Sequence, residues 1–154
     1  MYEKLLVPVD GSSLAECALN HAAAMVKGGF ARELTVLNVV KIDIPWADAT
    51  NRKFDINKLR DHTFAMSLRY LADVEPRLAS QGVPVRTEAI ESHRPAEAIT
   101  DYARQKGIDL IVMATHGHTG VKELMLGSVA RSVLHLSHVP VLLIRPASCV
   151  PNPL

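Results

Sequence analysis

The sequence predicts one α/β domain, built on an open, doubly wound parallel sheet of five strands with helices on both faces. Short apolar runs rich in β-branched residues alternate along the chain with amphipathic stretches of helical length. This alternation is typical of βαβ units. Three of the runs are apolar almost throughout, as expected for strands that helices cover on both faces. A chain of 154 residues is also long enough to bury a core of its own.

Each apolar run is expected to form one strand. The third run differs from the others because polar and apolar residues alternate in it, which is typical of a half-exposed edge strand. The expected strands are Lys4–Val9, Leu34–Val40, Val83–Ile90, Leu110–Ala114 and Val139–Ile144.

Four helices are expected between these strands, each with recognisable start or stop signals. Serine is a frequent N-cap, proline is favoured in a first turn, and glycine commonly follows a helix end, as Gly28-Gly29 does here. Pro76 is expected to kink or loosen the last turn of the second helix. The helices are expected after Ser12 or Ser13, over about Ile56–Ser80, over Pro95–Gln105, and after Gly127-Ser128.

Residues 1–146 are expected to form the single domain and residues 147–154 a C-terminal tail. A polar connection, residues 41–56, follows the second strand and holds Trp46, the one tryptophan of the chain. A connection of about 15 residues is long for a compact domain. It is either a variable surface excursion or a lid over a ligand, and the sequence leaves both interpretations open.

The composition excludes several classes of protein. The chain has 17 Lys+Arg and 16 Asp+Glu residues and a formal net charge of +1, so it lacks the basic field that drives nucleic-acid binding. No apolar run approaches the roughly 18 residues needed to cross a bilayer. Cys17 and Cys149 have no metal-ligand spacing and indicate no disulfide framework. This pattern favours a reducing compartment, and we expect a cytoplasmic protein.

The exit of the first strand carries a candidate ligand-binding group. In open α/β sheets, ligands bind outside the carboxyl ends of the strands, and residues 8–12 (PVDGS) leave the first strand there. The carboxylate of Asp10 could accept hydrogen bonds from a sugar hydroxyl or a base amine, while Gly11 leaves space for the ligand. The alternative is that Asp10 and Ser12 only cap the following helix.

The exit of the fourth strand carries a glycine-bearing loop that ends in Gly127-Ser128 at a helix start. Glycine permits positive φ and close backbone approach, so consecutive N–H groups can point at one anion. The helix start adds free N–H donors and the positive end of the helix dipole. The loop is therefore a candidate phosphate site, although its glycines could also serve turns and caps alone. The sequence contains no GxxxxGK[ST], and the early Asp10-Gly11 turn is not GxGxxG.

The sequence resembles the universal stress protein family, in its small single-domain form. Three segments carry the likeness: KLLVPVDGS, GIDLIVMATHGHTGVKELMLGSVARSVL and HVPVLLIRP. Nucleotide-binding members share the ATP pattern G-x2-G-x9-G-[ST]. In this resemblance, the second glycine of the pattern corresponds to Gly117, and its last two positions correspond to Gly127 and Ser128. The first position, where the pattern has glycine, is Ala114. The resemblance implies a Rossmann-like fold of the adenine nucleotide alpha hydrolase type.

The resemblance also implies which residues form the nucleotide site. The implied contacts run from the adenine and ribose end, past the ribose and phosphates, to a helix start that clamps the phosphates. In that order they are Pro8, Val9, Asp10 and Val39, then Thr115, His116 and Gly117 with Met113 and Ala114 before them, and finally Gly127, Ser128 and Val129.

The implied ligand is ATP, accompanied by Mg2+ or Mn2+. A divalent cation is expected because only Lys122 and Arg131 are cationic near the implied phosphate site. His116 and His118 form an HxH pair without a carboxylate or thiolate partner, so we expect loop contacts there rather than metal ligands. No separate metal site is expected in the protein.

The last strand predicts a partner. In a sheet ordered 3-2-1-4-5 it lies at an edge, and a long apolar edge without charges invites pairing with another chain. In the family that the sequence resembles, this strand pairs with its copy about a two-fold axis, which implies a homodimer. Alternatively, the C-terminal tail covers the edge. The residues implied at the interface are Val139, Val141, Leu142, Leu143 and Ile144.

The function expected from these observations is that of an ATP-binding, dimeric regulator of the stress response. Two alternatives stay open. One is a member of the same fold that has lost tight nucleotide binding through Ala114 and acts only through protein contacts. The other is a slow ATP hydrolase or phosphotransferase, for which the sequence offers no base that can be named.

Overall fold

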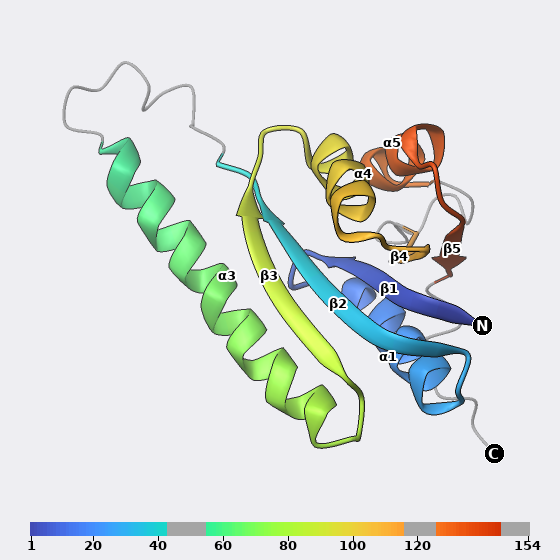
Figure 1. Ribbon diagram of the computed structural model, residues 1–154. Helices are drawn as coiled ribbons and strands as arrows, with labels where there is room; N and C mark the ends of the chain where they lie inside the picture. Colours follow the sequence, from blue (N-terminus) through green and yellow to red (C-terminus); the bar gives the residue numbers. More distant parts are fainter. Residues whose placement is uncertain (43–54, 116–125, 146–154) are drawn as a thin grey trace.

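Five strands form one parallel sheet in the order β3-β2-β1-β4-β5 in the computed structural model, which describes residues 1–42, 55–115 and 126–145 (Figure 1). The predicted fold class and strand order are therefore confirmed. The elements are β1 (Tyr2–Val9), α1 (Ser13–Lys27), β2 (Ala31–Val40), α3 (Ile56–Ala79), β3 (Val85–Glu91), α4 (Pro95–Lys106), β4 (Leu110–Ala114), α5 (Ser128–Leu136) and β5 (Val141–Ile144).

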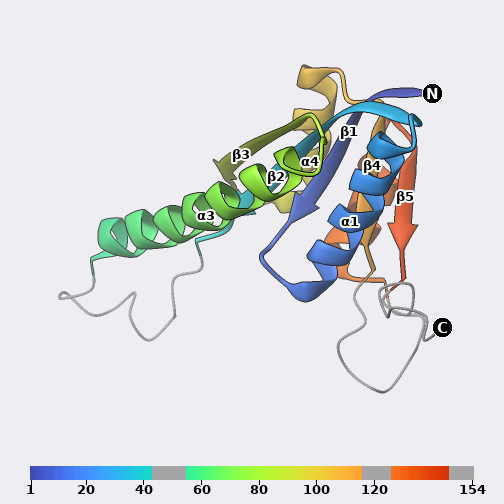
Figure 2. The same cartoon turned by 90° about the horizontal axis from the view of Figure 1, so that it is seen from below.

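Side-chain alternation in the central strand β1 divides the core into two layers. Leu5 is buried on one face of the sheet with residues of α1 and α3, whereas Leu6 is buried on the other face with residues of α4 and α5. Figure 2 shows α1 and α3 on the same side of the sheet. The winding of the chain therefore reverses between β1 and β4, which are hydrogen-bonded neighbours at the middle of the sheet.

The start and stop of α1 follow the predicted signals. The Ser12 hydroxyl accepts a hydrogen bond from the Ala15 N–H at 3.3 Å, so Ser12 is the N-cap. Gly28 is the C-cap, and the next residue, Gly29, has φ of +76°, a backbone conformation that favours glycine. These two glycines therefore release the chain from α1 into β2.

The start of β5 and the end of α3 can be compared with the bounds expected from the sequence. β5 begins at Val141, two residues later than expected, because Pro140 has no N–H to donate to the sheet. The preceding residues form a turn in which the Ser137 hydroxyl donates to the Val139 carbonyl at 2.7 Å. Helix α3 continues through Pro76 to Ala79, and the Ser80 N–H donates to the Pro76 carbonyl at 2.9 Å.

The side chain of Cys17 is 5% exposed and lies in the core cluster that α1 forms with the sheet. The other cysteine, Cys149, lies outside the described residues, as do residues 43–54 of the possible lid and the tail from residue 146.

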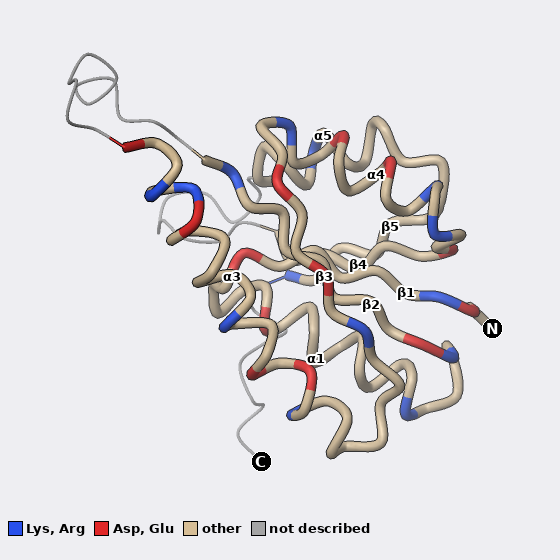
Figure 3. Tube along the Cα trace, turned by 60° about the vertical axis from the view of Figure 1, so that its left-hand side comes forward, with Lys and Arg blue, Asp and Glu red and all other residues tan. Residues whose placement is uncertain are grey.

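Charged residues of both signs are interspersed along the described elements (Figure 3). Several of them pair, for example Arg60 with Glu91 at 2.5 Å and Arg77 with Glu16 at 2.5 Å. Among the described helices, none combines the length and the apolar character that a membrane crossing requires.

A carboxylate just before β4 fastens the start of β1. Asp109 accepts hydrogen bonds from the Glu3 N–H at 2.7 Å and from the Lys4 N–H at 3.0 Å, one to each carboxylate oxygen. Its own N–H donates to the Lys4 carbonyl at 3.1 Å. Asp109 therefore extends the pairing of β1 and β4, whose ladder begins at Leu5 and Leu110.

Asp109→Asn is expected to lower the free energy of unfolding by about 1–2 kcal/mol. The new amide nitrogen would face one of the two backbone N–H donors, so one charge-assisted hydrogen bond is lost. Asp101→Asn is the matched control, because Asp101 is exposed on α4 and only pairs with Arg104 at 3.5 Å. Urea unfolding of both variants tests this, and equal losses would show that the Asp109 bonds contribute nothing particular.

Candidate functional site

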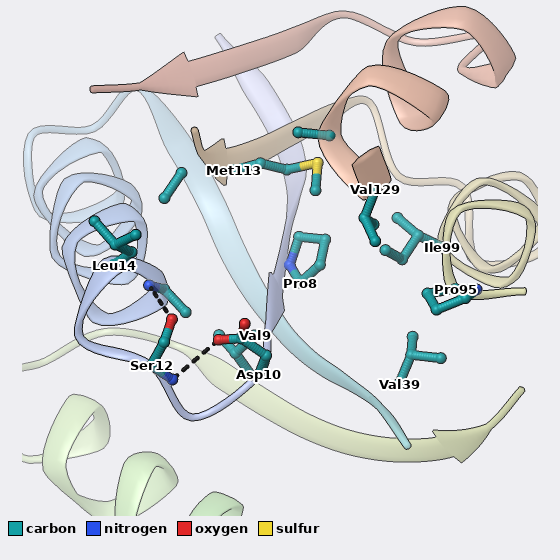
Figure 4. Close-up of a pocket in the computed structure, with 13 residues that line it drawn as sticks. Pro8, Val9, Asp10, Ser12, Leu14, Val39, Pro95, Ile99, Met113 and Val129 are labelled. Carbon is teal, nitrogen blue, oxygen red and sulfur yellow. Dashed lines mark hydrogen bonds between the residues drawn. The ribbon is translucent and has the colours of Figure 1, made fainter. Parts of the chain in front are cut away.

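A pocket of about 180 Å³ opens at the carboxyl ends of the strands. It lies at the reversal of the winding between β1 and β4, where ligands of doubly wound sheets bind. Strand ends and first helical turns supply its walls (Figure 4). The lining residues are Pro8, Val9, Asp10, Ser12, Leu14, Ala15, Val39, Pro95, Ile99, Met113, Ala114, Val129 and Ala130.

One side of the pocket is an apolar slot. Pro8 and Met113 come from the ends of neighbouring strands, and Ile99 and Val129 approach from α4 and α5 (Figure 4). Val39 and Pro95 extend this wall toward β2 and the start of α4. Apolar walls with few polar groups are usual in sites that bind small organic ligands. The slot suits a flat, largely apolar group.

The opposite side of the pocket carries its polar groups, Asp10 and Ser12. Asp10 is exposed and is the one charged residue among those that line the pocket. One of its carboxylate oxygens accepts the Ser12 N–H at 2.9 Å, and Ser12 caps α1. The capping role considered from the sequence is therefore confirmed. The second carboxylate oxygen of Asp10 has no hydrogen bond among the described residues and can accept one from a ligand.

The start of α5 is a second candidate binding element. Gly127 is the N-cap, and no side chain of the described part of the protein caps this helix. The first N–H groups of a helix have no partner within it, and they attract anions together with the helix dipole. Gly127 and Ser128 do not line the pocket, but the next two residues, Val129 and Ala130, do. An anion at this helix start would therefore lie beside the pocket.

The structure brings most of the expected site residues together. The pocket includes seven of them, listed here: Pro8, Val9, Asp10, Val39, Met113, Ala114 and Val129. Thr115 does not line the pocket, and its N–H and its hydroxyl both donate to the Ile144 carbonyl, at 2.9 Å and 3.4 Å. His116 and Gly117 lie outside the described residues.

Metal ligation has no support from side-chain clusters in the described ranges. Within them, no group of three or more His, Cys, Asp or Glu side chains is arranged to hold a metal ion. The pair His116 and His118 lies outside these ranges. Asp10 is the one carboxylate among the residues that line the pocket.

A comparison with protein families shows to which family this chain belongs. The model of the universal stress protein family matches residues 1–145. The chain belongs to this family. The universal stress protein YxiE of Bacillus subtilis is 33% identical over 150 residues, which cover 94% of this chain and all of YxiE.

A solved universal stress protein shares the whole architecture. The structure of MJ0577, a universal stress protein of Methanocaldococcus jannaschii, aligns with a TM-score of 0.77 and 31% identity. The alignment covers 94% of this chain and 96% of that one. The strand order and both helical layers described above are therefore those of the family.

Two more distant universal stress proteins have been solved with adenine nucleotides. One, in complex with cAMP, aligns with a TM-score of 0.68 and 20% identity over 93% of this chain and 97% of its own. The other, from Arabidopsis thaliana with AMP bound, aligns with a TM-score of 0.67 and 18% identity over 97% and 96%. For this chain, these likenesses show the fold.

Ala114, which replaces the first glycine of the ATP pattern, does not need the conformational freedom of glycine here. It is the last residue of β4, and no described non-glycine residue has a positive φ. Its side chain is half-buried and packs against the core on the α1 side of the sheet. The alanine methyl therefore lies in a wall of the pocket, in a backbone conformation open to any residue.

Ala114→Gly is expected to change the affinity of the pocket for a ligand such as ATP, the one implied by the sequence resemblance, by less than about threefold, because the backbone at this position is already extended. It should also lower the free energy of unfolding by about 0.5–1 kcal/mol, since glycine weakens a strand and removes a packed methyl. Calorimetric titration and thermal unfolding test the two effects. A gain of tenfold or more in affinity would show that the methyl obstructs the ligand.

Apart from Val129, sequence reasoning missed the pocket residues that come from helices. Leu14 and Ala15 belong to the first turn of α1, Pro95 and Ile99 to α4, and Ala130 to α5. One signal was available: Pro95 follows the exit of β3, and first turns lie at the same edge of a parallel sheet as the strand ends. The side that each first turn presents to the pocket depends on helix packing.

Proposed function

We propose that this universal stress protein binds an adenine nucleotide, ATP with Mg2+ or Mn2+, at the carboxyl edge of its sheet and acts as a dimeric regulator. The observation that carries this proposal is the combination of an apolar slot, one carboxylate at its opposite wall, and a helix start without a side-chain cap beside it. A purine nucleotide has the matching parts: a flat ring, sugar hydroxyls and an anion.

The residues divide the work along the ligand. Val39, Ile99 and Val129 would pack against the base in the apolar slot. Asp10 would accept a hydrogen bond from a ribose hydroxyl or a base amine through its second oxygen. The phosphates would accept hydrogen bonds from the backbone N–H groups at the start of α5, after Gly127. Helix α5 contains one arginine, Arg131, and no lysine. A divalent cation would therefore balance the remaining phosphate charge.

Other members of the fold support an adenine nucleotide as the ligand class. A universal stress protein has been solved in complex with cAMP and another with AMP. Both ligands contain the adenine and ribose that the slot and Asp10 would hold. ATP adds two phosphates that would reach further along the α5 start.

The direct test has two steps. The purified protein is denatured, and any released nucleotide is identified by chromatography and mass spectrometry. ATP, ADP, AMP and adenosine are then titrated into protein stripped of nucleotide, with and without Mg2+ or Mn2+. Binding that strengthens with phosphate number and with the cation supports the proposal. No carried nucleotide and no heat change at millimolar ATP would contradict it in favour of a protein-interaction role.

A regulatory role fits the pocket better than catalysis. Among the residues that line it, only Asp10 and Ser12 could act on a water molecule. The Ser12 hydroxyl is engaged in the α1 cap, and the open oxygen of Asp10 is assigned to the ribose or the base. Hydrolysis also needs a group that stabilises the transferring phosphoryl, and none of the lining residues is cationic. Sustained phosphate release that disappears in Asp10→Asn would reverse this conclusion.

Dimerisation is proposed through the β5 edge. Within the described residues β5 pairs with β4 alone, and Leu142 on this strand is 37% exposed. Leu134 and Leu136 of the neighbouring helix α5 are also exposed. An exposed apolar edge of this kind favours pairing with a second chain.

Leu142→Glu is therefore expected to convert a dimer into a monomer, because two buried carboxylates would face each other across the two-fold axis. Leu68→Glu is the matched control, since Leu68 is exposed on α3, away from β5. Sedimentation velocity at several protein concentrations measures the change. A parent protein that sediments as a monomer throughout would contradict the dimer.

A further inference from the structure

Glu16 joins the helix that forms one wall of the pocket to a different helix. It lies in the first turn of α1, directly after the pocket residue Ala15. Its carboxylate accepts a hydrogen bond from the Tyr70 hydroxyl at 2.6 Å and another from the Arg77 guanidinium at 2.5 Å. Both donors belong to α3. One carboxylate therefore holds α1 and α3 together, with one oxygen for each donor.

The same turn connects Glu16 to Asp10. The Glu16 N–H donates to the Ser12 carbonyl at 3.2 Å, and the Ser12 N–H donates to the Asp10 carboxylate at 2.9 Å. The polar wall of the pocket is thus a short series of hydrogen bonds that ends at α3. A shift of the first turn of α1 would move Ser12 and Ala15 relative to the apolar slot.

The pKa of Tyr70 is shifted by the groups around its hydroxyl. Burial, the hydrogen bond to Glu16 and the negative charge of Glu16 raise the pKa of Tyr70 well above its usual value. The charge of Asp10 acts in the same direction, and the Arg77 guanidinium acts against it.

Exposed ion pairs are usually worth little, because solvent screens them and both side chains lose freedom. The Glu16 pair differs from such pairs in two respects. The side chain of Glu16 is only 26% exposed, and both of its oxygens are engaged by donors of another helix. Bonds of this kind fix the position of a helix more firmly than a single exposed pair does.

We propose that Glu16 is a positioning residue for the ligand pocket, which it serves by anchoring the first turn of α1 to Tyr70 and Arg77. The inference rests on the proposed nucleotide-binding function. It adds that ligand binding in the pocket also stabilises α3. A ligand held by Asp10 restricts the motion of the first turn of α1, and the hydrogen bonds of Glu16 to Tyr70 and Arg77 extend this restriction to α3.

Glu16→Gln is the central variant, because it keeps the size of the side chain and removes its charge. Glu97→Gln is a close control. Glu97 also lies in the first turn of a pocket-lining helix, α4, and also pairs with an arginine, Arg94, at 3.1 Å. Its pair is local and its side chain is 50% exposed. Adenosine affinity is expected to fall about fivefold in Glu16→Gln and less than about twofold in Glu97→Gln.

Amide hydrogen exchange separates positioning from a merely structural role. Without ligand, the N–H groups of Ala15 and Glu16 should exchange faster in Glu16→Gln than in the parent. With adenosine bound, the parent should gain protection around residues 70–77 of α3, and Glu16→Gln should lose this gain even at saturating ligand. Tyr70→Phe removes one of the two bonds, provides a milder second variant if Glu16→Gln unfolds, and should lose part of the gain.

The outcomes distinguish this inference from the proposed function. If the parent binds no adenine compound, the proposed function fails and the ligand-dependent part of the inference fails with it. If the parent binds but Glu16→Gln binds equally well and keeps the ligand-dependent protection of α3, only the inference is overturned. In that case, Glu16 contributes to stability alone.

Discussion

Gly127→Val is expected to weaken ATP binding by about 100-fold while the fold stays intact. Gly127 has φ of −58° and ψ of 153°, an extended conformation that valine adopts readily. The branched side chain of valine would, however, occupy space at the start of α5. It would keep the phosphates from the backbone N–H groups whose hydrogen bonds they are proposed to accept. The loss of two charge-assisted hydrogen bonds, each worth about 1.5 kcal/mol, corresponds to about 100-fold in affinity.

Adenosine provides the control for this variant, because it has the base and ribose but no phosphate. Its affinity should be the same in Gly127→Val and in the parent, so the variant should bind ATP about as weakly as adenosine. Isothermal titration calorimetry with both ligands measures this. Unchanged ATP binding would place the phosphates away from α5, and equal losses for both ligands would indicate a general distortion of the pocket.

Leu6→Ala is expected to lower the free energy of unfolding by about 2–5 kcal/mol. Leu6 lies in the central strand β1 and has no exposed surface. It packs in the same cluster as Ile99 and Met113, which line the pocket. Truncation would leave a cavity beneath the ligand site. For a domain whose total stability is about 5–15 kcal/mol, this is a large share.

Leu68→Ala is the matched control, because Leu68 is 51% exposed on α3. Its truncation should change stability by less than about 0.5 kcal/mol, since little packing is lost and alanine is a good helix former. Urea unfolding of both variants gives the comparison. Similar losses in both would mean that the core formed by Leu6, Ile99 and Met113 is not what stabilises the fold.

The fold could be predicted because local patterns and burial agree in this sequence. The run KLLVPV reads as a strand covered on both faces, and Leu5 and Leu6 are indeed buried in different layers. The ends of the strands were less predictable where a single hydrogen-bond donor determines them. Val139 looks like the start of a strand, but the missing N–H of Pro140 moves the start of β5 to Val141.

The site was predictable at strand ends and less so at helices. Asp10 and Val39 follow from the rule that ligands bind at the carboxyl edge together with the family resemblance. Ile99 does not, because its position on α4 reveals burial but not that part of the buried side faces a pocket. Long-range bonds were also hidden: Glu16 and Tyr70 are 54 positions apart in the chain, and no local pattern relates them.

The hydrogen bond between Asp10 and Ser12 has a consequence for how this protein can change through evolution. The carboxylate that would recognise a ligand also closes the turn before α1. A substitution at position 10 that altered ligand preference would at the same time loosen a helix that packs on the core. Variation in ligand preference is therefore expected to accumulate first at positions such as Val39 and Ala114, which line the pocket without closing a turn.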